Sequence, residues 1–98
     1  MGSSASFTCI TNDSSAIRWT HLYSTTGKLA TVYNGHKIRQ ELSDKYVVIN
    51  TSFGLSHLTI KNIQINDTGN LSCYEAHTDN QRYSFELRVL GKNILYMC

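Results

Sequence analysis

Histidine and cysteine are the residue types in this 98-residue chain that could support nucleophilic catalysis or bind a metal. Nucleophilic catalysis needs a nucleophile beside an oriented base, and a zinc site needs ligands at short, regular spacing. His36, His57 and His77 lie on separate segments and form no His-x-x-x-His pattern. His21 stands two residues after Trp19 in a run of strand-forming residues, where we expect a buried structural histidine. The sequence therefore predicts no enzyme, no metal and no cofactor.

The composition is that of a folded domain. Hydrophobic residues make up 41% of the chain and charged residues 16%, a balance that supports a packed core and argues against disorder. The formal net charge is +2 and the basic residues are scattered, so nucleic acid is not a predicted partner. No apolar stretch approaches the ~20 residues of a membrane-spanning helix. Any membrane contact is therefore expected through a segment outside this chain.

Alternating β-branched and aromatic residues predict an all-β protein. The runs lie at residues 5–11, 16–23, 29–33, 46–50, 55–61, 71–77 and 83–90. Turn clusters rich in Asn, Asp, Ser and Gly separate them, and many short strands with regular turns favour a sandwich or a barrel. Residues 35–45 lack helical spacing, so we expect an extra edge strand and a loop there.

Cys9, Trp19 and Cys73 each fall in the middle of a predicted strand, and an Asp-x-Gly-x-Leu-x-Cys motif occupies residues 67–73. This order resembles the immunoglobulin superfamily over about residues 5–90. The resemblance implies an immunoglobulin-like antiparallel β-sandwich in which a Cys9–Cys73 disulfide packs against Trp19. A chain of this length holds one domain, which we place at residues 1–91, with 92–98 as a C-terminal tail or the start of a stalk.

The resemblance is to the variable (V-like) type. Residues 32–35 look like a C′ strand and turn, and residues 37–41 like a C″ strand. In V-like domains a basic residue that opens strand D pairs with the Asp before strand F, which assigns an ion pair to Lys45 and Asp67. The short segment before Cys9 implies that strand A is short or absent. The core residues implied are Trp19, Leu58, Ile60, Leu71, Leu87 and Val89.

One residue departs from the family pattern at a structurally important position. The tyrosine corner places Tyr two residues before the second Cys, and this chain has Leu71 there. The side chain at this position should still point inward. The corner hydrogen bond must therefore be absent or replaced.

The cysteine count bears on compartment and assembly. A Cys9–Cys73 disulfide implies an oxidising, extracellular environment. Cys98 would then be left over, either as an interchain disulfide or because a partner cysteine lies outside the chain. Sequons for N-glycosylation agree with an extracellular protein, and they begin at Asn12, Asn50, Asn66 and Asn70.

Strand alternation predicts the face that binds a partner. With Trp19 and Cys73 inward, a patch of apolar and aromatic residues points out of one sheet. The predicted contacts are Thr20, Leu22, Leu29, Thr31, Tyr33, Tyr74 and Ala76. We expect a recognition module of a cell-surface receptor or adhesion protein that binds a protein ligand or an identical chain, as a homodimer. The alternative is a soluble secreted immune effector or decoy.

Overall fold

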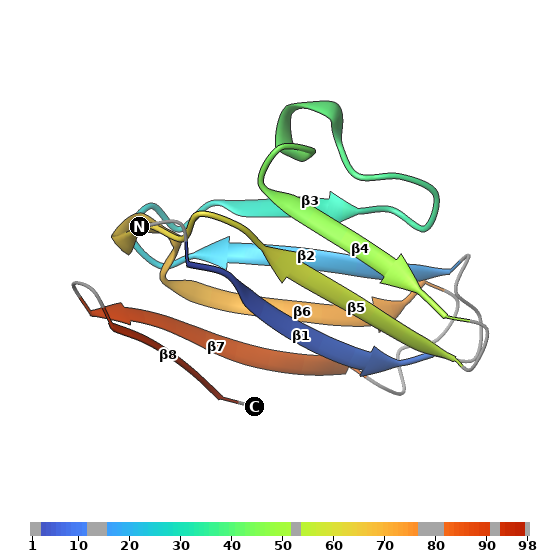
Figure 1. Cartoon of the computed structure of the whole chain (residues 1–98). Helices are drawn as coiled ribbons and strands as arrows, with labels where there is room; N and C mark the ends of the chain where they lie inside the picture. Colours follow the sequence, from blue (N-terminus) through green and yellow to red (C-terminus); the bar gives the residue numbers. More distant parts are fainter. Residues whose placement is uncertain (1–2, 12–15, 52–53, 77–81, 91–92, 98) are drawn as a thin grey trace.

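The computed structural model describes residues 3–11, 16–51, 54–76, 82–90 and 93–97 (Figure 1). Within these segments the chain is built of strands and two short 3-10 turns. The strands are β1 (Ala5–Ile10), β2 (Ile17–Tyr23), β3 (Leu29–Tyr33), β4 (Tyr46–Asn50), β5 (Leu55–Ile60), β6 (Gly69–Glu75), β7 (Arg82–Leu90) and β8 (Asn93–Met97). The 3-10 turns are η1 (Gln40–Leu42) and η2 (Ile65–Asp67).

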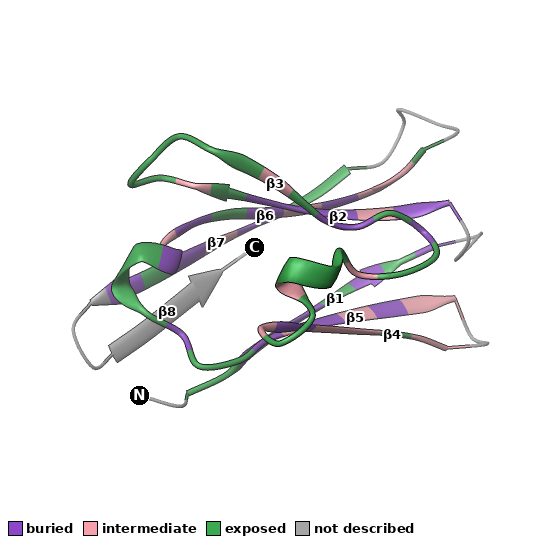
Figure 2. Cartoon of the chain, turned by 90° about the horizontal axis from the view of Figure 1, so that it is seen from above, coloured by how far each residue is buried: buried purple, intermediate pink, exposed green. Residues whose placement is uncertain are grey.

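The strands form two antiparallel sheets. One sheet has the order β1-β5-β4, and the other has the order β3-β2-β6-β7-β8. The two sheets face each other in Figure 1, and the view from above shows buried positions recurring along the strands between them (Figure 2). The all-β antiparallel sandwich expected from the sequence is therefore the observed fold.

The space between the sheets is filled by the inward half of each strand. β1 alternates strictly between buried and exposed positions, and β5 alternates between intermediate and buried ones, as half-buried strands do. The exposed fraction is 0% for Leu58, Ile60, Leu71 and Leu87, and 6% for Val89. The residues expected in the core, Trp19 included, are all buried.

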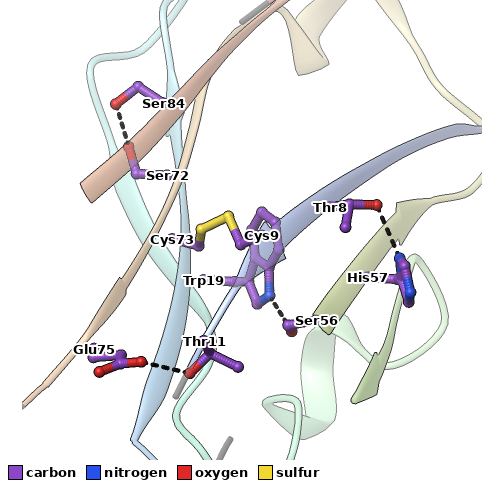
Figure 3. The surroundings of a disulfide bond; sticks show 10 residues. All are labelled: Thr8, Cys9, Thr11, Trp19, Ser56, His57, Ser72, Cys73, Glu75 and Ser84. Carbon is purple, nitrogen blue, oxygen red and sulfur yellow. Dashed lines mark hydrogen bonds between the residues drawn. A yellow bond between two sulfur atoms is a disulfide. The ribbon is translucent and has the colours of Figure 1, made fainter. Parts of the chain in front are cut away.

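A disulfide links the two sheets through the middle of the core, as the resemblance implied. It joins Cys9 on β1 to Cys73 on β6 (Figure 3). Trp19 lies in register with Cys73 on the adjacent strand β2 and is fully buried. Its indole Nε1 donates a hydrogen bond to Ser56 Oγ on β5 at 2.9 Å, so Trp19 also connects the two sheets. This bond satisfies a buried polar group that would otherwise destabilise the core.

The expected C″ strand at residues 37–41 does not form. After β3 the chain makes a single bridge, between Tyr33 and Ile38, and then enters η1. The Asn34 side chain explains the departure, because its Oδ1 accepts hydrogen bonds from the backbone N–H groups two and three residues further on, at 3.0 and 3.2 Å. Such a side-chain turn replaces the extended backbone that a strand needs.

The segment expected as a tail is a strand. β8 pairs antiparallel with β7, from Glu86 opposite Met97 to Leu90 opposite Asn93. β8 covers the edge of β7 and so extends the sheet. At the other end of the described chain, Ser3 leads directly into β1, the first strand of the described residues. Residues 93–97 therefore form the edge strand of the larger sheet, and the boundary expected at residue 91 stays a prediction. Cys98 lies outside the described residues.

We predict that replacing both disulfide cysteines, Cys9→Ala with Cys73→Ala, lowers the free energy of unfolding by about 4 kcal/mol. A cross-link spanning 64 positions restricts the unfolded chain by about that amount in the chain-entropy model. Urea unfolding followed by the fluorescence of Trp19 measures the change. Cys98→Ser is the matched control and should leave the midpoint unchanged. Equal stability of the double variant and the parent would contradict the role assigned to this bond.

Candidate functional site

The solvent side of the β3-β2-β6-β7 sheet carries an apolar pair. We call this surface the outer face. Leu22 and Leu29 are in register on β2 and β3, and they are 39% and 64% exposed. Adjacent apolar side chains on a sheet surface are the kind of feature that distinguishes an interface from isolated exposed residues.

The other end of the outer face is aromatic and basic. Tyr74 on β6 lies in register with Arg18 on β2 and with Arg82 on β7. The Arg82 guanidinium carbon is 4.2 Å from the centre of the Tyr74 ring, a cation–π contact. Tyr and Arg are the residues that most often carry binding energy at interfaces. The contacts predicted from the sequence include neither arginine, because that prediction rested on the apolar and aromatic residues of the face.

Tyr33 does not belong to the outer face, contrary to expectation. Along β2, Trp19 pairs with Tyr33 but Thr20 pairs with Thr31, so Val32 is an extra residue in β3. This β-bulge turns two successive side chains, Val32 and Tyr33, into the core, where they are 0% and 9% exposed. Strict alternation places Tyr33 outward, and the bulge is the reason it fails.

Two further predicted contacts are placed differently by the structure. Thr20 is on the outer side of β2 but only 5% exposed, because it lies between Thr31 and Ser72 on the two adjacent strands. Ala76 is exposed, but it lies in the turn after β6, where its N–H donates to the Ala16 carbonyl at 2.9 Å. Thr31 is exposed on β3 as expected.

At the Leu22 end, the outer face carries a compensated charge. Glu86 lies in register with Asn70 and pairs with Arg88 at 3.0 Å, with both side chains about half exposed. Surface ion pairs of this kind contribute little to stability and remain free to exchange partners. The outer face is therefore basic at its Tyr74 end and holds a carboxylate at its Leu22 end.

Asp67 is the centre of a group of polar contacts at the end of the sandwich where β2 ends. The ion pair expected with Lys45 is present, with Nζ 2.8 Å from Asp67 Oδ2 and the carboxylate almost fully buried. The same oxygen accepts the Gln64 backbone N–H at 2.8 Å, which closes η2. Lys45 also donates to the Asn62 carbonyl at 3.2 Å. The buried carboxylate thus has two donors, the Lys45 ammonium and the Gln64 N–H, as a buried charge requires partners.

His21 replaces the missing tyrosine corner. His21 is fully buried, and on β2 it pairs in register with Leu71 on the adjacent strand β6. Nε2 is 2.8 Å from the backbone carbonyl oxygen of Asp67, four residues before Leu71. That carbonyl, a few residues upstream on the backbone, is the type of group that the corner Tyr hydroxyl bonds. A side chain of the neighbouring strand therefore supplies the corner hydrogen bond.

The hydrogen bonds of His21 fit a neutral ring. A carbonyl only accepts, so Nε2 carries a hydrogen, and in the neutral ring Nδ1 accepts from the Tyr46 hydroxyl at 2.8 Å. The Tyr23 hydroxyl then donates to Tyr46 Oη at 2.6 Å. Burial lowers the pKa of the His21 imidazole below 6.5, although the bond to Asp67 opposes this shift. Burial also raises the pKa of the Tyr46 hydroxyl above its ordinary value of 10.

The candidate glycosylation sites differ in their surroundings. Asn50 is turned inward, with Nδ2 donating to Tyr33 Oη at 3.0 Å, so in the folded chain its amide is not presented for a sugar. Asn66 is exposed in η2, and Asn70 is exposed on the outer face. Asn12 lies outside the described residues.

An open hollow of about 430 Å³ adjoins the Asp67 end. Its lining is Tyr23, Thr25, Thr26, Lys45, Gln64, Asn66 and Asp67. Among the described residues, no three of His, Cys, Asp and Glu gather as metal ligands would. Over the same segments, no helix has the length and apolar character to span a membrane.

Comparison with solved structures identifies the fold of the chain. No protein-family model matches the sequence, and no curated protein is similar to it. The crystal structure of the ZIG-8 Ig1 homodimer is similar at a TM-score of 0.67 and 18% identity, over 91% of this chain and 72% of that one. The chain has an immunoglobulin-like fold. The monoclinic ZIG-8–RIG-5 Ig1–Ig1 heterodimer matches at the same TM-score and identity, over 91% of this chain and 75% of that one.

We predict that this immunoglobulin-like domain loses stability as the pH falls below about 6.5, the ordinary pKa of histidine. The unfolded chain takes up a proton at His21 in that range, whereas the folded domain resists because its pKa there is lowered. Acid therefore favours the unfolded state. Urea unfolding on both sides of this pH measures the effect.

Variants test whether His21 is responsible. His21→Gln should flatten the pH dependence, while His57→Gln on β5 should retain it because His21 is untouched. An undiminished loss of stability in His21→Gln would contradict the assignment.

Proposed function

We propose that this immunoglobulin-like domain is an extracellular recognition module of a cell-surface receptor or adhesion protein. It binds a protein partner through the outer face, and the partner we commit to is a second copy of the chain. The observation that carries the proposal is the outer face itself. It combines the exposed Leu22–Leu29 pair with the Tyr74–Arg82 contact on one antiparallel sheet.

Three further features support the proposal. The Cys9–Cys73 disulfide fits an oxidising, extracellular compartment. The β3 strand at the edge of the larger sheet is compatible with the V-like type. The two similar crystal structures are dimers of Ig1 domains, one homodimeric and one heterodimeric. Among the described residues, Cys9, Cys73 and His21 have structural roles, and we propose no catalysis for the chain.

The charges on the outer face favour one symmetric arrangement of two copies. A homodimer with two-fold symmetry is formed by the same surface of both copies, and for face-to-face sheets the axis lies between them. Arg18, Tyr74 and Arg82 form one row across neighbouring strands. If the axis ran along the strands, this row of one copy would lie against the same row of the other copy, with like charges opposed. An axis across the strands brings Arg82 of one copy toward Glu86 of the other. We therefore propose the second arrangement.

Substitutions on the outer face test the site. We predict that Leu29→Arg and Tyr74→Ala each weaken self-association by at least about tenfold, because they remove apolar or aromatic contact area. Sedimentation velocity over a concentration series measures the dissociation constant. All proteins should carry Cys98→Ser, so that a covalent link between chains cannot hide the non-covalent one.

The opposite sheet provides the matched control. Ile49 on β4 has an exposed fraction of 59%, similar to the 64% of Leu29, but it faces the other side of the sandwich. Ile49→Arg should therefore leave association unchanged. If Ile49→Arg separates the copies while Leu29→Arg does not, the proposed face is wrong.

Charge reversal tests the arrangement. We predict that Arg82→Glu alone and Glu86→Arg alone each weaken self-association, and that the double variant recovers part of the loss because the two charges meet across the interface. Losses that simply add in the double variant would contradict the axis across the strands. Urea unfolding of each variant separates a change in association from a change in stability.

A further inference from the structure

Asn70 lies within the proposed interface and begins an Asn-Leu-Ser sequon. It is exposed on β6, with Leu22 opposite it on β2 and Glu86 opposite it on β7. Residues that pair directly on neighbouring strands share a face of the sheet. The amide of Asn70 therefore projects from the same surface as Leu22.

The other described sequons lack this placement. Asn50 uses Nδ2 in its hydrogen bond to Tyr33 Oη, and Asn66 is exposed on η2, outside the strands of the outer face. Asn66 and Asn70 are thus two exposed sequons of the same chain, four positions apart. One is off the proposed interface and the other is within it.

A sugar chain at Asn70 and pairing through the outer face exclude each other. Sheets that pack face to face lie about 10 Å apart, and the side chains of both sheets fill that gap. An N-linked oligosaccharide is far bulkier than any side chain, so at Asn70 it would hold the partner's sheet away from Leu22 and Glu86. The same sugar chain on an unpaired domain would extend into solvent over Leu22.

We propose that N-glycosylation of Asn70 controls whether the outer face can pair. The glycosylated chain is a monomer, and the unmodified chain associates. This inference rests on the proposed function, since it assigns a control to the same face. Asn70 is the second residue of β6, a strand paired on both sides, so the modification is made while the chain is still unfolded and is fixed once β6 joins β2 and β7.

The chemistry is a group transfer from a lipid-linked oligosaccharide donor. A bond forms between Asn70 Nδ2 and the anomeric carbon of the first sugar, while the bond from that carbon to the diphosphate of the lipid breaks. The lipid diphosphate leaves with the bonding electrons, and the amide nitrogen gives up one proton. Nothing is oxidised or reduced.

The experiment compares the secreted chain with two single variants. The parent, Asn70→Gln and Asn66→Gln, each with Cys98→Ser, are produced in cells that perform N-glycosylation. Mass spectrometry determines which asparagines carry sugar, and sedimentation velocity determines the oligomeric state. Native enzymatic deglycosylation of the parent removes the sugar by hydrolysing the side-chain amide, which leaves Asp at each formerly glycosylated Asn.

We expect the parent and Asn66→Gln to carry sugar on Asn70 and to be monomers. Asn70→Gln and the deglycosylated parent should associate. Asn66→Gln is the matched control, because it removes a neighbouring sequon without touching the outer face.

Two results would overturn the inference and leave the proposed function standing. One is a parent chain that is secreted without sugar on Asn70 and associates. The other is a parent that carries sugar on Asn70 and associates as strongly as Asn70→Gln. A third result, Asn70→Gln and the deglycosylated parent both remaining monomeric, overturns pairing with a second copy and the inference with it.

Discussion

The link between Cys9 and Cys73 is the constraint on which the rest of the structure depends. It ties β1 of the smaller sheet to β6 of the larger one, and Trp19 packs beside it while donating to Ser56. Phe85 stacks on the Trp19 ring, with the ring centres 6.3 Å apart. Once these side chains point inward, the pleat decides which residues of β2 and β6 point outward. The recognition surface is therefore a consequence of how the core is tied together.

The buried polar groups show how the fold accommodates a departure from its family's pattern. Leu71 adds apolar volume to the core but leaves the Asp67 carbonyl without the hydroxyl that a corner Tyr supplies. His21 fills that role from the adjacent strand, and its second nitrogen is satisfied by Tyr46. A buried unpaired carbonyl would destabilise the fold by about 1–3 kcal/mol, so the replacement keeps this end of the sandwich intact. Burial, not this hydrogen bond, is what favours the neutral ring.

Sequence reasoning predicted the parts of the fold that repeat and missed the parts where the repeat breaks. Strand positions follow from alternation, and the core and the Lys45–Asp67 pair follow from the resemblance to V-like domains. Tyr33 was misplaced because a single extra residue in β3 reverses its side, and this bulge has no signature in an alternating run. The C″ strand failed through a local turn at Asn34, and β8 depends on an edge that is apparent only after the sheet is assembled.

The two outward surfaces of the sandwich are not equivalent, which bears on where recognition takes place. On the smaller sheet, cross-strand pairs satisfy each other: Ser6 bonds Thr59 and Thr8 bonds His57, each at 2.9 Å. The exposed isoleucines there lie on β1 and β4, opposite edges of the sheet with β5 between them, so they are not direct neighbours. On the larger sheet the exposed leucines are direct neighbours. Adjacent apolar side chains on a surface mark a site of interaction. A second domain or a sugar chain can shield them from water.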